Sequence, residues 1–214
     1  MTDDIVNPIP PKKRANTRKR LVAGTADLIR RKGLNATSLR EVVKHTGTPR
    51  GSIRHHFPRG KRQLVEEALL LAGRSVSAQL RQRVQQAGAL GGLAAFIEGW
   101  KQTLEQSDFE AGCPILAVAA EQYVAEDGYP NAEVQDQLLQ RTAAAFAEWQ
   151  SILMESLQQE GVAADQARPL ATVIISAVEG AVTMCRAAKS TAALSEVEWV
   201  LSGLLRAALP STPA

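Results

Sequence analysis

Apolar residues recur at every fourth position over one long stretch of this chain, and this spacing limits the possible folds more than any other feature. The series comprises Leu64, Ala68, Ala72, Val76, Leu80 and Val84. Residues four apart share one face of an α-helix, whereas the side chains of a strand repeat every two residues. Ala, Leu, Gln, Glu and Arg dominate the chain and aromatic residues make up 4% of it, which favours helices. We therefore predict an all-α fold without a sheet, in which one long helix covers about residues 61–86.

Capping residues and helix breakers place the other helix boundaries. Ser38 with Glu41, and Ser195 with Glu198, each form a capping box at the start of a helix. Glycine or proline marks most other ends, because glycine closes a helix in the left-handed conformation and proline lacks the donor that a helix interior needs. The expected helices cover about residues 12–33, 38–47, 49–57, 61–86, 93–107, 114–127, 131–160, 165–188 and 195–209.

These helices, about nine in all, divide the chain into two parts. The helices of residues 12–60 form an N-terminal unit, and residues 61–209 form a larger helical body with a flexible glycine-rich link over 88–92. Residues 1–11 contain three prolines and no apolar periodicity, so we expect a disordered tail there. Residues 210–214 are expected to form a short C-terminal tail.

Charge is distributed very unevenly between the two ends of the chain. Residues 1–62 hold 16 Lys and Arg against 4 Asp and Glu, whereas residues 63–214 hold 9 against 18. A basic end attracts a nucleic acid through release of counterions from the phosphates, and an acidic end is repelled by it. We therefore expect the N-terminal unit to bind nucleic acid and the body to serve another purpose.

A helix, a glycine turn and a short helix follow one another between residues 38 and 57. Gly47 ends the first of these helices, Thr48 caps the next, and Pro49 stands at its first position, where proline is favoured. Together they form a helix-turn-helix unit, whose second helix enters the major groove of DNA. Ile53 and Phe57 are available to anchor the back of that helix. The candidate DNA-contacting residues on it are Thr48, Arg50, Gly51, Ser52, Arg54 and His55.

Further phosphate contacts are expected from Thr37, Ser38 and Arg40, near the start of the second helix, and from Lys61, at the start of the long one. Arg50 could fork onto guanine or pair with a phosphate, and the residues leave both open. Taken on charge alone, the basic run could equally be a solvated surface or an RNA-binding face. His55 and His56 are adjacent and point about 100° apart on a helix, so no metal site is expected.

The segment from Thr37 to Leu64 resembles the N-terminal domain of the TetR family of transcriptional repressors. That family has a glycine, a hydrophobic residue, a tyrosine and a His-Phe pair in its recognition helix, followed by Lys-x-x-Leu. The matching residues are Gly51, Ile53, His56, Phe57, Lys61 and Leu64. Arg54 stands where the family usually has a phosphate-contacting tyrosine, and an arginine can still hold a phosphate. More weakly, residues 112–117 and 178–181 are similar to the branch of lincomycin-resistance and flavonoid-responsive repressors.

The resemblance implies a homodimer that binds a palindromic operator and is released by a small molecule. The residues support a dimer independently, because the segment from Leu170 to Met184 is apolar on nearly every face and must be covered. A partner subunit would cover it by pairing the last two helices around a two-fold axis. The alternative is the central core helix of a monomer. Ligand binding between the middle helices is expected to shift the helix of residues 61–86 and so to change the separation of the two recognition helices.

A ligand cavity in the body needs apolar walls and a few polar groups. Candidate ligand-binding residues are Phe96, Trp100, Glu121, Tyr123, Phe146, Trp149 and Glu179. Glu179 is a lone carboxylate in an apolar helix and must be paired or protonated; Arg186 could pair with it, which would be a structural role. Cys113 is expected to be a packed thiol, with a redox sensor as the alternative.

Several other classes of protein are disfavoured. All three histidines lie in the basic end and no phosphate-binding glycine loop is present, so we expect neither an enzyme nor a bound cofactor. Cys113 and Cys185 lack neighbouring cysteines, which argues against a disulfide framework or a zinc site. The uninterrupted apolar runs are far shorter than the roughly 20 residues of a membrane span, and no signal peptide is apparent. A cytoplasmic protein is expected, and a non-specific DNA-packaging protein remains the main alternative.

Overall fold

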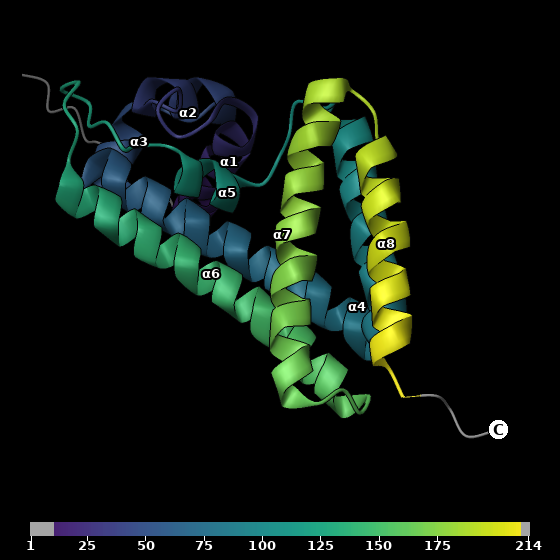
Figure 1. Ribbon diagram of the computed structural model, residues 1–214. Helices are drawn as coiled ribbons and strands as arrows, with labels where there is room; N and C mark the ends of the chain where they lie inside the picture. Colours follow the sequence, from purple (N-terminus) through teal and green to yellow (C-terminus); the bar gives the residue numbers. More distant parts are fainter. Residues whose placement is uncertain (1–10, 211–214) are drawn as a thin grey trace, which may run out of the picture.

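The computed structural model describes residues 11–210, with side chains from residue 16 onward. Within this range the chain forms eight α-helices and no sheet, which confirms the all-α prediction (Figure 1). The helices are α1 (Pro11–Lys32), α2 (Leu39–Thr46), α3 (Gly51–His56), α4 (Gly60–Gln106), α5 (Pro114–Ala120), α6 (Ala132–Gln159), α7 (Ala164–Ala188) and α8 (Ala192–Ala208). The predicted tails, residues 1–11 and 210–214, lie outside the described residues except for Pro11, which begins α1, and Pro210, which follows α8.

The N-terminal unit is built from the capping signals of the sequence. Ser38 Oγ accepts the N–H of Glu41 at 3.2 Å and starts α2, and Gly47 ends it in the left-handed conformation at φ 60°, as expected. The side chain of Glu41 does not return to the cap and instead pairs with Lys32 at 3.2 Å. The helix α3 begins at Gly51, two residues later than predicted, and it carries no side-chain cap.

The helix α4 is bent, and its bend accounts for the difference between the nine expected helices and the eight observed. Gly88 has φ 69° and ψ −175°, which divides α4 into two helical arms; a glycine reaches that region at little cost. Glu160, at the end of α6, accepts the backbone N–H of Ala89 and so caps the second arm. A side chain at Gly92 would approach Val84 to 2.7 Å. The predicted flexible link is therefore a tight elbow.

The body packs around this elbow. The helix α6 runs along the first arm of α4, and α7 and α8 lie side by side next to the second arm (Figure 1). Trp149 of α6 is fully buried, and its indole Nε1 donates to the carbonyl of Gly73 at 3.3 Å. The elbow thus carries the chain from the N-terminal unit to the α7–α8 pair.

Two segments of the body differ from the sequence prediction. The helix α5 ends at Ala120 rather than near residue 127, and residues 121–131 form an irregular connection. The helix α8 begins at Ala192 rather than at Ser195, so the predicted capping box lies inside it. Glu198, the second member of that box, pairs with Lys101 of α4 at 2.8 Å. Contacts with distant parts of the chain override the local signal in both places.

The helix α7 is the one described helix that could cross a membrane by length and composition alone. Uninterrupted apolar runs did not reveal it, because small and polar residues are scattered through it. The most apolar stretch of 18 residues in α7 is 44% buried inside the body, where α7 packs against α6 and α8. The core helix of a soluble protein passes the same test, so this finding is weak support for a membrane span.

Candidate nucleic-acid interface and ligand cleft

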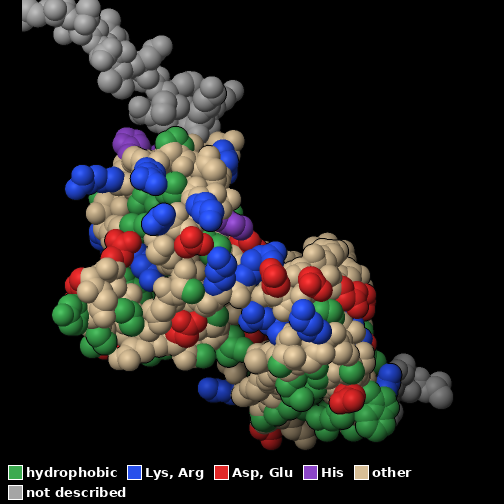
Figure 2. Space-filling view, turned by 90° about the horizontal axis from the view of Figure 1, so that it is seen from above, with side chains coloured by type: hydrophobic (Ala, Val, Ile, Leu, Met, Phe, Trp, Pro, Cys, Tyr) green, Lys and Arg blue, Asp and Glu red, His purple; other side chains and the backbone are tan. Residues whose placement is uncertain are grey.

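At the basic end, α3 lies on the surface and packs through its inner face against the core of the N-terminal unit. Ile53 and Phe57 are 7% and 1% exposed, which places them in the core of the N-terminal unit, as predicted. The guanidinium of Arg18 lies 5.3 Å from the centre of the Phe57 ring. The outer face of α3 and its approach carry Arg50, Gly51, Arg54 and His55, all exposed. Figure 2 shows Lys and Arg side chains gathered around the exposed histidines at this end of the molecule.

The neighbouring face of α2 extends this basic surface. Arg40 and Lys44, one helical turn apart, are both exposed and line a groove between α2 and α3 together with Arg50 and Arg54. The sequence prediction missed Lys44, although its spacing of four from Arg40 places both on one helix face. Ser38 and Ser52 are partly exposed at the edge of the same surface. The arrangement offers a cluster of cations to a phosphate backbone.

Three of the predicted DNA contacts are buried. Thr37 is 1% exposed and donates its hydroxyl to the carbonyl of Gly33 at 2.7 Å. Thr48 is 6% exposed, and its hydroxyl lies 2.9 Å from that of Thr46. These hydroxyls stabilise the turns on either side of α2 and do not face the solvent.

Lys61 is the third of these residues, at 7% exposed. Its ammonium lies 5.6 Å from the centre of the Tyr123 ring, a cation–π contact with the α5–α6 connection. Burial lowers the pKa of Lys61, although Glu126 and Glu121 oppose that shift. The side chain therefore joins α4 to the body, and its predicted phosphate contact is not supported by this position.

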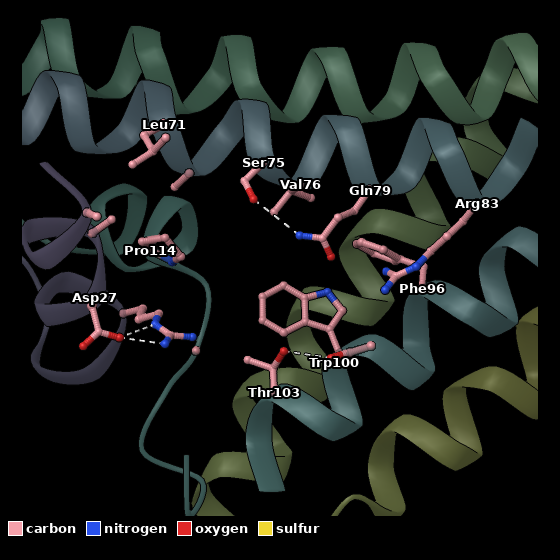
Figure 3. Close-up of a pocket in the computed structure, with 16 residues that line it drawn as sticks. Asp27, Leu71, Ser75, Val76, Gln79, Arg83, Phe96, Trp100, Thr103 and Pro114 are labelled. Atoms are coloured by element: carbon pink, nitrogen blue, oxygen red, sulfur yellow. Dashed lines mark hydrogen bonds and ion pairs between the residues drawn. The ribbon is translucent and has the colours of Figure 1, made fainter. Parts of the chain in front are cut away.

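A cleft of about 390 Å³ lies between α1, both arms of α4 and the loop before α5 (Figure 3). Its apolar walls include Leu71, Val76 and Pro114, with the rings of Phe96 and Trp100 on the second arm of α4. Ser75, Gln79 and Arg83 on the first arm of α4, with Asp27 and Arg30 on α1, supply its polar groups. Apolar walls with a few polar groups are typical of a small-molecule site.

The C-terminal end of α1, which walls this cleft, is tied to the body by several hydrogen bonds. The backbone N–H of Gly112 donates to the carbonyl of Arg30 at 2.8 Å. One guanidinium nitrogen of Arg186, on α7, donates to the carbonyls of Arg31 at 3.1 Å and Glu110 at 2.8 Å. A ligand that moved α1 would therefore act on the N-terminal unit directly.

Comparison with known proteins gives the family of the chain. The sequence model described as bacterial regulatory proteins of the tetR family matches residues 21–68, and the one described as the C-terminal domain of LmrA/YxaF-like transcriptional regulators matches residues 89–199. An HTH-type transcriptional regulator of Mycobacterium tuberculosis is 37% identical over 193 residues, which cover 90% of this chain and 96% of that protein. This chain belongs to the TetR family.

Other relatives agree with this assignment. The HTH-type transcriptional regulator LmrA of Bacillus subtilis is 24% identical over 196 residues, covering 89% of this chain and 97% of that protein. A TetR transcriptional regulator from Chloroflexus aurantiacus, 26% identical, superposes with a TM-score of 0.73 over 92% of this chain and 98% of its own. One from Legionella pneumophila, 20% identical, has the same fold, with a TM-score of 0.75 over 93% and 99%. These relatives are transcriptional regulators and not enzymes.

Within this TetR-family chain, the cleft brings together only some of the predicted ligand-binding residues. Phe96 and Trp100 line it. Phe146 packs edge-on against Trp149 at 5.3 Å between ring centres, and Trp149 belongs to the core between α4 and α6. Tyr123 is buried over Lys61. These last three aromatic residues have packing roles, and periodicity alone does not separate a core ring from a cleft ring.

Glu121 lies outside the cleft and has a structural role. Its carboxylate accepts the backbone N–H groups of Leu34 at 2.9 Å and Asn35 at 3.1 Å. Asn35 in turn donates to the carbonyl of Gln122 at 2.7 Å and accepts the N–H of Val124 at 3.0 Å. The α5–α6 connection thereby holds the turn between α1 and α2, and Glu121 links the body to the N-terminal unit.

Glu179 is also outside the cleft, and it does not pair with Arg186. It is 5% exposed, and one of its carboxylate oxygens has no hydrogen-bond partner among the described residues. Burial raises the pKa of Glu179 to about 7, and a hydrogen bond with the Cys113 thiol partly offsets this.

Burial, together with the nearby Glu179, raises the pKa of Cys113 well above its ordinary value. Cys113 is thus a protonated packed thiol, which caps α5 by accepting the N–H of Leu116.

The pKa of Glu179 leads to a prediction about stability. Because this pKa is raised in the fold from 4.5 to about 7, the folded protein holds a proton there that the unfolded chain releases. Its stabilising effect is therefore complete below pH 4.5 and is lost as the pH rises through 7. The unfolding free energy of the parent protein should fall by about 3 kcal/mol between pH 5 and pH 9 as this proton is released. We expect Glu179→Gln, which mimics the protonated acid, to abolish this fall. Urea unfolding across this range measures it, with the exposed Glu196→Gln as control; parallel pH profiles of parent and Glu179→Gln would contradict the assignment.

Proposed function

We propose that this TetR-family protein is a ligand-responsive repressor that binds a palindromic operator as a homodimer and is released by a small molecule. In this proposal residues 12–60 read the DNA, and residues 61–209 supply most of the ligand site and hold the dimer together. The observation that carries the proposal is the cleft, which is walled at once by α1 of the N-terminal unit and by both arms of α4. A cytoplasmic location follows from a role on DNA.

The DNA contacts proposed here come from the accessible part of the basic surface. Arg50 and Gly51 lie at the start of α3, where side chains of a recognition helix reach base edges. Phosphate contacts are assigned to exposed or partly exposed side chains around them. Those side chains are Ser38, Arg40, Lys44, Ser52, Arg54 and His55.

A homodimer through α7 and α8 is supported by the apolar side chains that these helices expose. Trp199 is 79% exposed, Met184 62% and Val200 50%. Single exposed apolar side chains are common on protein surfaces, but contiguous groups of large ones mark interfaces. Figure 2 shows apolar side chains gathered at the end of the molecule opposite the basic surface. Pairing α7 and α8 with their copies in a second subunit would bury them in a four-helix interface.

Release would follow from the position of the cleft. A ligand between α1 and α4 contacts Ala23 and Ala26 of the N-terminal unit as well as Phe96 and Trp100 of the body. It would move α1 and the first arm of α4 relative to the body and so change the distance between the two recognition helices. Half-sites are about 34 Å apart along the duplex, and displacements of a few ångströms break that match.

Selection of bound duplexes from a random pool tests the proposal. We expect a palindromic site whose half-sites are one helical turn apart, bound at least about a thousandfold more tightly than random DNA. Equal affinity for selected and random duplexes would instead indicate a non-specific DNA-binding protein, the second candidate, which the basic surface alone would also support. The same duplex, titrated with cleft-binding compounds in a gel-shift assay, tests release.

A further inference from the structure

Arg83 is a cation without a counter-charge at one end of the cleft. It lies on the first arm of α4, half-buried, with its guanidinium 5.8 Å from the centre of the Phe96 ring. No carboxylate pairs with it among the side chains that the structure describes. Burial alone lowers the pKa of Arg83, yet a guanidinium stays charged in proteins. A half-buried charge normally has a partner of opposite charge. The guanidinium of Arg83 lacks that partner in the fold.

The other charges of the cleft are already neutralised by one another. Asp27, at the opposite end in Figure 3, pairs with Arg30 at 2.6 Å and with Arg31 at 3.2 Å. His45 also lies 2.9 Å from its carboxylate. Burial opposes ionisation of this carboxyl, but the two arginines lower the pKa of Asp27 overall. A ligand therefore meets no free negative charge in the cleft, and its one unpaired positive charge is Arg83.

Trp100 gives a second, independent indication beside Arg83. It is 8% exposed, and its indole Nε1 is buried without a hydrogen-bond acceptor in the described part of the chain. Figure 3 shows this nitrogen on the side of the ring that faces Gln79, with Arg83 beyond. An indole N–H is a donor only, and leaving a buried donor unpaired is unfavourable. At this end of the cleft, the Arg83 guanidinium thus lacks a paired carboxylate and the Trp100 Nε1 lacks a bonded acceptor among the described residues.

We propose that the effector is a small, flat organic anion with a single carboxylate, which pairs with Arg83 while its apolar body lies against Trp100 and Phe96. This inference rests on the proposed function, since it names the class of ligand that the cleft would take. A carboxylate matches the two parallel donors of a guanidinium, and one of its oxygens can also accept from the Trp100 Nε1. Leu71, Val76 and Pro114 would cover the rest of the ligand.

Other ligand classes fit the cleft less well. A neutral ligand would leave Arg83 unpaired, and a cation would place like charges together. A phosphate ester carries close to two charges at neutral pH, and the cleft has only one free cation among its lining residues. A volume of about 390 Å³ is near the lower end for ligand pockets, so the ligand is small.

Arg83 could also serve only to cover the Phe96 ring, and the test separates these two roles. The probes are naphthalene carboxylate and biphenyl carboxylate, each with its carboxamide and its aminomethyl analogue. Binding to the full-length protein is measured by isothermal titration calorimetry. We expect each carboxylate to bind about ten- to a hundredfold more tightly than its carboxamide, as a charged hydrogen bond implies, and the amines not to bind.

Variants test whether the preference for carboxylates depends on Arg83 and Trp100. Arg83→Gln is expected to abolish the preference for carboxylate over carboxamide, Arg83→Lys to keep part of it, and Trp100→Phe to weaken carboxylate binding about tenfold. Arg81→Gln is the matched control, because Arg81 lies on the same arm and approaches Glu148 and Glu155 at 3.9 and 3.8 Å, outside the cleft. Thermal unfolding of each variant identifies any that fails to fold.

Each outcome of this experiment decides the inference. Carboxamides or amines that bind as well as carboxylates, a preference that survives Arg83→Gln, or no binding by any probe would overturn it. Operator release is measured separately with the same compounds. Neutral compounds that bind and release the operator would contradict the anion site and support the repressor, whereas carboxylates that bind through Arg83 without release would support the site and contradict the proposed release.

Discussion

Replacing Trp199 with glutamate is expected to convert the proposed dimer into a folded monomer. Trp199 is 79% exposed in the single chain, so the substitution costs the isolated fold little, about 0.5 kcal/mol or less. In a dimer through α7 and α8 the same change removes a large aromatic anchor and buries an unpaired carboxylate, at a cost of several kcal/mol. Sedimentation should then give the mass of one 23.0 kDa chain instead of two.

The loss of the dimer should also be visible on DNA. A single subunit holds only one half-site, so operator affinity should fall by more than about a hundredfold. Tyr129→Glu is the control, because Tyr129 is 72% exposed but lies in the α5–α6 connection. If the Trp199→Glu protein still sediments as a dimer, the dimer interface lies outside the α7–α8 surface.

Features set by neighbouring residues were predictable from the sequence. The Ser38 cap and the left-handed Gly47 depend only on contacts within about five residues, and both are present. The same holds for the start of α6, predicted near residue 131, where the side chain of Asn131 accepts the N–H of Val134 at 3.0 Å. The apolar spacing also predicted the first arm of α4 and, through Ile53 and Phe57, which side of α3 faces inward.

Features that depend on contacts across the fold were not predictable in this way. Lys61 looks like a surface cation in the sequence, but the α5–α6 connection brings the Tyr123 ring over it. Glu121 ends α5 early because its carboxylate satisfies the N–H groups of Leu34 and Asn35, almost 90 residues earlier in the chain. Neither partner can be identified from local pattern.

The cleft also depends on contacts across the fold, so local sequence patterns did not predict it. Its lining comes from α1, both arms of α4 and the loop before α5, and only the elbow at Gly88 brings the two arms to face each other. The aromatic residues of the second arm were within reach of sequence reasoning, since Phe96 and Trp100 share a helix face. Arg83 was not, because an arginine on a helix usually lies in solvent, and its lack of a carboxylate partner becomes apparent only in three dimensions.

Arg50→Ala and Arg54→Ala are expected to weaken operator binding strongly and in different ways. Both side chains are exposed on the basic surface, and a dimer loses two copies of each contact. At about 1–3 kcal/mol for a base contact, Arg50→Ala should lower operator affinity by roughly thirtyfold or more. Fluorescence anisotropy with the selected duplex measures this. Arg74→Ala, which removes an exposed arginine from α4, is the control for loss of charge.

Salt dependence then separates the two roles that an arginine can have here. If Arg54 holds a phosphate, as the tyrosine at that position does in the TetR family, Arg54→Ala should weaken all duplexes alike and reduce the salt slope by about 2 per dimer. If Arg50 reads a base edge, Arg50→Ala should leave most of that slope but lose discrimination at one position of each half-site. Equal losses of slope for both variants would instead place both arginines on phosphates, and the sequence preference would then have to come from the remaining α3 side chains or from the shape of the duplex.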